Sequence, residues 1–278
     1  MADPGLFACI PFFSSLPQVK DMKIISLPCS FDNYSYLLIC EETGIAAVVD
    51  PAEYYPISCA VADAGVSLRA ILCTHHHADH IGGLDDLLEE FSGVDVYGHA
   101  GDKRRIHGLN SPVAEGATVQ IGRNMGRVLY TPGHTAGSIC YLFGEELFTG
   151  DTLFGAGCGR LFEGTPKQMH DALDTIAHSL PPATRIHFGH EYTAHNLKFA
   201  HFVEPGNAAV AARQELVDRQ RTAGQPTTPS TLADEAATNP FLRCREQGIV
   251  DTVAQRFFGE DLDPLSVFTA LRRLRDVF

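Results

Sequence analysis

The chain has 278 residues, of which 45% are apolar and 20% are charged, as is usual for a globular protein. Its formal net charge of −13 at pH 7 opposes binding to nucleic acid and to anionic membrane surfaces. No segment approaches the roughly 18 consecutive apolar residues of a membrane span. We therefore expect one or two folded domains, with no nucleic-acid or membrane partner.

The cysteines and the N-terminal residues indicate in which cellular compartment we expect the protein. The eight cysteines form no Cys-x-x-Cys pair, and several lie inside apolar runs, as is typical of reduced thiols in an intracellular protein. Residues 1–21 carry an apolar patch, Leu6 to Phe13, but no basic residue before Lys20. This pattern fits neither a signal peptide nor an arginine-rich transit peptide. We expect an N-terminal extension over residues 1–21 and a cytoplasmic protein, with a mitochondrial form left open.

From Met22 the sequence predicts strands and helices in alternation, which is typical of an α/β fold. The expected strands cover residues 23–27, 34–40, 45–49, 69–73 and 94–98, and the expected helices cover residues 55–65 and 82–91. A charged helix or loop follows at residues 102–105.

The segment from Thr74 to His80 joins the strand at 69–73 to the helix at 82–91 and holds four histidines and an aspartate. Its candidate ligands, spaced His-x-His-x-Asp-His, are His75, His77, Asp79 and His80. Imidazoles and carboxylates are the ligands of a borderline divalent metal, and alternating side chains can face two neighbouring ions. A fortuitous histidine run on a solvated loop is the alternative, which this density of ligands disfavours.

Three further strand ends carry a candidate ligand next to Gly or Thr. His134 follows a strand at residues 127–130, Asp151 follows one at 147–149, and His190 follows one at 185–188. One such residue is usually a turn former, but four strand ends of this kind in one chain favour a shared metal site.

After His190 the composition shifts to Ala, Glu, Arg and Gln, and strand signals disappear. We expect helices over residues 207–221, from near Ser230, and from Asp263, where an Asp N-cap precedes a proline at the first helical position. The expected domains are residues 22–190, which bind metal, and residues 191–278, which are helical.

Seven candidate ligands exceed what one tetrahedral ion needs, so two ions are expected. We assign His75, His77 and His134 to the first ion and Asp79, His80 and His190 to the second, with Asp151 shared. Two ions at roughly 3.5 to 4 Å lower the pKa of a bridging water and give hydroxide at neutral pH. Attack by this hydroxide on an electrophilic centre is the expected chemistry, with Zn²⁺ as the expected metal and iron or manganese as alternatives.

Several motifs resemble glyoxalase II, the hydroxyacylglutathione hydrolases of the metallo-β-lactamase superfamily. They are THHHADH, TPGHTAGS, TGDTLF, FGHEYTAHNLKFA and NPFLR, and the resemblance runs from Met22 to the end of the chain. It implies an αββα sandwich that carries the metals and a C-terminal helical domain that completes the substrate site. The implied reaction is hydrolysis of S-D-lactoylglutathione to D-lactate and glutathione, the second step of methylglyoxal detoxification, with Asp79 and Asp151 as catalytic ligands.

The resemblance also places residues that bind the thiol carrier. Arg160 stands where the family usually has Lys, Phe162 stands where it usually has Tyr, and Tyr192 of the HEYT motif matches. Phe162 lacks the hydroxyl that could bond to the peptide, and ordinary aromatic packing remains the alternative for it.

The terminal helix adds two basic residues. Its helical period predicts a buried stripe that consists of Val267, Leu271, Leu274 and Phe278. Arg272 and Arg275 would flank one edge of this stripe, with Arg273 on the other, and two guanidiniums suit a substrate with carboxylates. A solvated basic face is the alternative.

Other functions compete with this interpretation. A mono-iron persulfide dioxygenase of the same fold would use fewer of the ligands, and a trypanothione-type carrier would use much of the same site. A metallo-nuclease conflicts with the charge of −13. A non-catalytic metal-binding module conflicts with the intact ligand set. We expect a monomer that acts on a small-molecule thioester.

Overall fold

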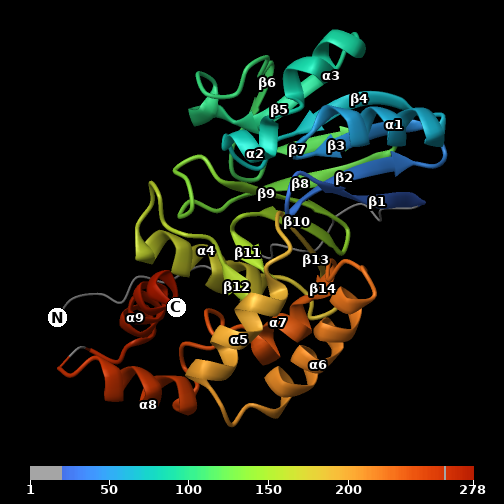
Figure 1. The fold of residues 1–278 in the computed structure, drawn as a ribbon. Helices are drawn as coiled ribbons and strands as arrows, with labels where there is room; N and C mark the ends of the chain where they lie inside the picture. The colour runs from blue at the N-terminus through green and yellow to red at the C-terminus, as the bar shows by residue number, and fades with distance from the viewer. Residues whose placement is uncertain (1–20, 260) are drawn as a thin grey trace, which may run out of the picture.

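The computed structural model describes residues 21–259 and 261–278. Residues 1–20, which make up nearly all of the predicted N-terminal extension, lie outside the described residues. Two six-stranded sheets stack face to face, and helices cover their outer faces (Figure 1). Among the described residues, none of the helices has the length and apolar character needed to cross a membrane.

The first sheet follows the order of the chain. Its strands are β1 (Met22–Cys29), β2 (Asn33–Cys40), β3 (Ile45–Val49), β4 (Ser67–Leu72), β5 (Asp95–His99) and β6 (Ser111–Val113). The pairs from β1 to β3 are antiparallel and those from β3 to β6 are parallel. The parallel half brings the carboxyl ends of β3 and β4 to the same edge.

The second sheet has the order β14-β13-β10-β9-β8-β7. Its strands are β7 (Thr118–Ile121), β8 (Asn124–Tyr130), β9 (Ile139–Phe143), β10 (Glu146–Gly150), β13 (Arg185–Phe188) and β14 (Ser230–Thr231). Strands β10 and β13 are parallel, so their carboxyl ends also share an edge. A small ribbon of β11 (Leu153–Phe154) and β12 (Gly157–Cys158) follows β10.

Helices cover both outer faces of the sandwich. On the first sheet lie α1 (Tyr54–Ala64) and α3 (Leu84–Glu90), and short turns are formed by α2 (Ala78–Ile81) and the 3-10 helix η1 (Ala100–Asp102). On the side of the second sheet lie α4 (Pro166–Ser179), α5 (Thr193–Val203), α6 (Ala208–Thr222), α7 (Leu232–Thr238), α8 (Gln247–Arg256) and α9 (Pro264–Val277).

The alternation of side chains along β2 explains why the sheet is covered on both faces. Leu38 points into the core between the two sheets, whereas Leu37 and Ile39 point into a second core beneath α1. All eight residues of β2 are buried, because an apolar strand with period-two alternation can serve two cores at once.

The predicted fold class is confirmed, and several details differ. The helix expected over residues 82–91 begins earlier and divides into α2 and α3. Helix α4 was not predicted, and β14 shows that the region after His190 does contribute a strand. The predicted stripe of α9 is wrong at its end, because Phe278 is 46% exposed while Val267 and Leu271 are fully buried.

Candidate metal centre

The seven candidate ligands gather at the edge where strands β4, β8, β10 and β13 end. His75 follows β4, His134 lies on the loop after β8, Asp151 follows β10, and His190 follows β13. Gly150 has φ +47, and a Cβ there would lie 2.2 Å from the hydroxyl of Thr74. Glycine is therefore required for β10 to turn this close to the histidine loop and place Asp151 over it.

One group consists of His75, His77 and His134. Nδ1 of His77 lies 3.1 Å from Nε2 of His75 and 2.9 Å from Nε2 of His134. His75 and His134 are buried, and His77 is partly exposed. The three nitrogens converge closely enough to share one ion.

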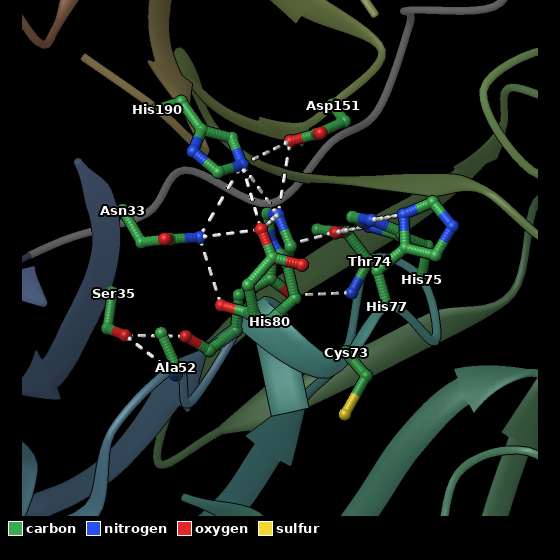
Figure 2. A network of polar contacts seen from close by, with 12 residues as sticks. Asn33, Ser35, Ala52, Cys73, Thr74, His75, His77, His80, Asp151 and His190 are labelled. Atoms are coloured by element: carbon green, nitrogen blue, oxygen red, sulfur yellow. Dashed lines mark hydrogen bonds and ion pairs between the residues drawn. The ribbon is translucent and has the colours of Figure 1, made fainter. Parts of the chain in front are cut away.

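A second group consists of Asp79, His80 and His190. The single turn of α2 presents Asp79 and His80 toward β13, where Nε2 of His190 lies 3.1 Å from Nε2 of His80 and 3.3 Å from Oδ2 of Asp79. Figure 2 shows His80, His190 and Asp151 reaching toward one another from separate segments.

Asp151 lies between the two groups and faces both. Its Oδ2 is 3.3 Å from Nε2 of His134, and its Oδ1 is 3.2 Å from Nε2 of His80 and 3.5 Å from Nε2 of His190. Each carboxylate oxygen therefore faces a different group. This arrangement is the one required of a ligand shared between two ions.

The outward nitrogens of three imidazoles are held by oxygen acceptors. Nδ1 of His134 lies 2.8 Å from the carbonyl oxygen of Arg160, Nδ1 of His80 lies 2.9 Å from Asp50, and Nδ1 of His190 lies 2.9 Å from Asp32. We assign the ring proton to Nδ1 in each case, since these oxygens can only accept. The inward Nε2 atoms are then lone pairs available to a metal.

The donor atoms fit divalent cations. Nε2 of His80 and Nε2 of His190 face each other at 3.1 Å, and two lone pairs at this distance repel unless a cation lies between them. Oδ1 of Asp151 is buried and receives no hydrogen bond from the described residues. A buried, unpaired carboxylate oxygen is costly, and coordination to a cation removes that cost.

Burial and charge set the protonation of the ligands. Burial lowers the pKa of His75 and of His134, which keeps both imidazoles neutral and able to bind metal. Burial opposes ionisation of Asp151, but the imidazoles of His80 and His190 hold its pKa well below the ordinary value. Burial also lowers the pKa of His80, but Asp151 and Asp50 outweigh it and raise that pKa, so a metal competes with a proton there.

Asp50 and Asp32 were not identified as site residues from the sequence. Asp50 accepts hydrogen bonds from the backbone N and the hydroxyl of Thr74, both at 2.7 Å, as well as facing His80. Asp50 could itself share an ion with His75 and His80. Its two oxygens are already occupied, however, by the backbone N and hydroxyl of Thr74 and by Nδ1 of His80. Asp50 ends β3 as the other candidates end their strands, a signal that was available. Asp32 has no comparable signal.

A cavity of about 700 Å³ opens from the metal site. It is lined by ligands of both groups and by Phe154, Cys158, Arg160, Phe162, Tyr192, His195, Asn196, Arg272 and Arg275. All five residues predicted to bind the substrate, three from the resemblance and two from the terminal helix, therefore line the cavity. Tyr192 stacks on His190 with ring centroids 4.7 Å apart, and Phe162 meets His77 edge-on at 5.5 Å.

The two arginines of α9 differ in their surroundings. Arg272 is only 5% exposed; its Nη1 donates to the carbonyl oxygen of Cys158 at 3.0 Å, and its Nη2 contacts Asp276 at 3.0 Å. Arg275 is half-buried and donates to Oδ1 of Asn196 at 3.1 Å. Arg273 is exposed, does not line the cavity and lies over the ring of Phe257.

Comparison with known families bears on this site. Residues 31–190 match the metallo-beta-lactamase superfamily, and residues 191–278 match the family described as hydroxyacylglutathione hydrolase C-terminus. A hydroxyacylglutathione hydrolase of Alkalilimnicola ehrlichii is 46% identical over 257 residues, which is 91% of this chain and 98% of that protein. The chain belongs to the hydroxyacylglutathione hydrolase family.

Two solved structures share the fold of this chain. The crystal structure of ETHE1 from Myxococcus xanthus has a TM-score of 0.63 and 27% identity, and the match covers 92% of this hydrolase chain and 99% of the other. The crystal structure of TTHA1623 in a di-iron-bound form has a TM-score of 0.54 and 26% identity, and it covers 79% of this chain and 100% of that one.

Proposed function

We propose that this enzyme hydrolyses the thioester bond of S-D-lactoylglutathione to give D-lactate and glutathione. The observation that carries the proposal is the position of Asp151 between two ligand groups, where it lines a cavity that arginines also line. The cavity size suits a tripeptide conjugate, since small-molecule sites usually enclose several hundred cubic ångströms. The match to the hydroxyacylglutathione hydrolase of Alkalilimnicola ehrlichii covers nearly the whole length of both proteins, which supports the proposal.

We infer that the site holds two divalent metal ions. The first would be held by His75, His77 and His134, the second by Asp79, His80 and His190, and Asp151 would serve both. Zn²⁺ suits this set of nitrogen and oxygen donors best, and iron or manganese are the alternatives. When bound, such ions supply hydroxide at neutral pH and stabilise the oxyanion that develops on the thioester carbonyl.

The chain itself binds and orients the substrate. Burial raises the pKa of Tyr192 to about 12, so its hydroxyl stays protonated and can donate a hydrogen bond to the peptide. Phe162 is 63% exposed beside His77 and offers an apolar surface to the substrate near the metals. Arg160 and Arg275 supply positive charge to the carboxylates, and Asp79 and Asp151 act as the catalytic ligands.

We propose the domain boundary at His190. Residues 22–190 would carry the metals, and residues 191–278 would complete the substrate site through Tyr192 and the α9 arginines. A trypanothione-type carrier is less favoured, because Arg275 is a cation suited to a free carboxylate. A mono-iron persulfide dioxygenase is less favoured because it leaves one ligand group without a role.

The test is the variant Asp151→Asn, which keeps the shape of the side chain. We expect turnover of S-D-lactoylglutathione, followed by loss of thioester absorbance, to fall by orders of magnitude and metal content to fall below two ions per chain. The circular dichroism spectrum should not change. Asp63→Asn, on the exposed face of α1, is the control. Full activity and unchanged metal content in folded Asp151→Asn would refute the two-metal assignment.

A further inference from the structure

The part of the cavity formed by α5 and α9 carries an excess of positive charge. Arg160, Arg272 and Arg275 all line it. Asp276 is the carboxylate that the described residues place against them, with its Oδ1 3.0 Å from Nη2 of Arg272 and 3.8 Å from Nε of Arg160. Three guanidiniums thus face one carboxylate in a protein whose net charge is −13, and this imbalance favours an anionic ligand.

Arg275 is the guanidinium best placed to bind that anion. Arg272 already donates to the carbonyl oxygen of Cys158 and to Asp276. Arg275 contacts only the neutral Asn196 among the hydrogen-bond partners described for it. Burial, followed by the charges of Arg272 and Arg160, lowers the pKa of Arg275, so its charge is poorly compensated without a ligand.

His195 lines the same cavity as this arginine and is not one of the candidate metal ligands. Its side chain lines the cavity from the second residue after the start of α5, next to Asn196, the partner of Arg275. Its ring lies 5.9 Å from the ring of Phe278, at the end of the chain beyond α9. Burial, followed by the charges of Arg275 and Lys198, lowers the pKa of His195, which places its ring in the same positive region.

We propose that His195 is a further substrate-binding residue, which together with Arg275 binds the glycine carboxylate of the glutathione moiety. The inference rests on the proposed function. Glutathione offers two carboxylates, and the one on the γ-glutamyl residue has an ammonium group beside it. Positive charge from Arg275 and Lys198 would repel that ammonium, whereas the glycine carboxylate stands alone. An imidazole always has at least one N–H to donate, so His195 can bond to it in either protonation state.

The test compares two substrates that differ only at this carboxylate. One is S-D-lactoylglutathione and the other is the S-D-lactoyl derivative of glutathione glycinamide, in which the carboxylate is a neutral amide. For the wild-type enzyme we expect a KM for the amide at least about tenfold higher than for the acid. In His195→Ala this ratio should fall about threefold or more, with kcat within about twofold, because binding far from the reacting carbonyl affects KM.

His201→Ala is the matched control, since His201 is an exposed histidine of the same helix that does not line the cavity. His195→Gln keeps a hydrogen-bond donor, so its ratio of KM for the amide to KM for the acid should lie between those of His195→Ala and the wild-type enzyme. An unchanged ratio in His195→Ala would overturn the inference while leaving the proposed function intact. Failure of the wild-type enzyme to hydrolyse either thioester would instead overturn the proposed function.

Discussion

Nδ1 of His134 lies 2.8 Å from the carbonyl oxygen of Arg160. The backbone N of Phe162 also donates to the carbonyl oxygen of His134 at 3.1 Å. The segment that presents Arg160 and Phe162 to the cavity therefore fixes both the ring and the backbone of a candidate metal ligand. Displacement of this segment should disturb substrate binding and ligand orientation together.

Glu163 connects this segment to its neighbours. One carboxylate oxygen accepts from the guanidinium of Arg105 at 2.5 Å, and the other accepts from the backbone N of Ala136 at 2.8 Å. We expect Glu163→Gln to raise KM about 3- to 10-fold, because it loses a charge-assisted contact that holds the segment in place. KM and kcat should be measured with metal content in parallel. Glu145→Gln, at an exposed position, is the control, and equal kinetics for the two variants would contradict the prediction.

Asp50 should control metal affinity without touching the metal. Asp50→Asn replaces the acceptor of His80 with an amide, which weakens the hold on the ring and removes a negative charge. Asparagine tolerates the positive φ of +48 at this position, so the backbone should be preserved. We expect metal affinity to fall about 10- to 100-fold, measured by competition with a chromophoric chelator. Asp63→Asn, the control, should leave metal affinity unchanged. Wild-type metal affinity in Asp50→Asn would show that the contact between Asp50 and His80 does not contribute to metal binding.

Alanine substitutions of the three arginines of α9 should differ in their effects on KM and on the free energy of unfolding. Arg275→Ala should raise KM about ten- to a hundredfold with little loss of stability. Arg272→Ala should raise KM and also lower the free energy of unfolding by about 1 to 3 kcal/mol, because it leaves buried acceptors such as the Cys158 carbonyl unpaired. Arg273→Ala should be nearly silent.

The measurements are KM at low and high ionic strength and urea denaturation of each variant. The wild-type KM should rise with salt, and Arg275→Ala should lose most of that dependence. Equal effects from all three substitutions would mean that the basic residues form only a solvated face.

Glu146 provides a prediction about pH, away from the metals. It faces Nε2 of His187 at 2.6 Å and accepts from Nε of Arg185 at 2.7 Å. Burial opposes ionisation, but these two partners lower its pKa below the ordinary value. A lowered folded-state pKa means that the stabilisation is complete above the ordinary glutamate pKa of about 4.3 and is lost as pH falls through the folded-state value.

Glu146→Gln should therefore lower the free energy of unfolding by about 1 to 3 kcal/mol at pH 7, and the difference from wild type should shrink below about pH 4. Urea denaturation of chelator-treated protein at several pH values measures this, since metal loss is then the same for both proteins. A difference that did not change with pH would show that the charge of Glu146 is not involved.

The candidate ligands could be predicted from the sequence because each depends on local patterns: a dense histidine motif, or a strand that ends in Gly and an acid or imidazole. Helix α4 also had a local signal, since Thr165 and Gln168 form a capping box around Pro166. Asp32 had none, because its partner His190 lies 158 residues away in the chain. The burial of Arg272 could not be predicted from the sequence either, because helical periodicity indicates the face on which a residue lies and not how deeply its side chain is buried.

Strand β14 affects whether residues 31–190 and residues 191–278, which match two different family models, could be separated from each other. Ser230 and Thr231 pair with β13, and buried Glu235 accepts from the backbone N of Ala156 and from Arg213. A cut after His190 would leave β13 as an open edge, which invites pairing with other chains. It would also strip Ala156 of its acceptor, just beyond the loop that carries Asp151. A chimaera that grafts another helical region onto residues 22–190 would thus have to supply both an edge strand and a buried carboxylate.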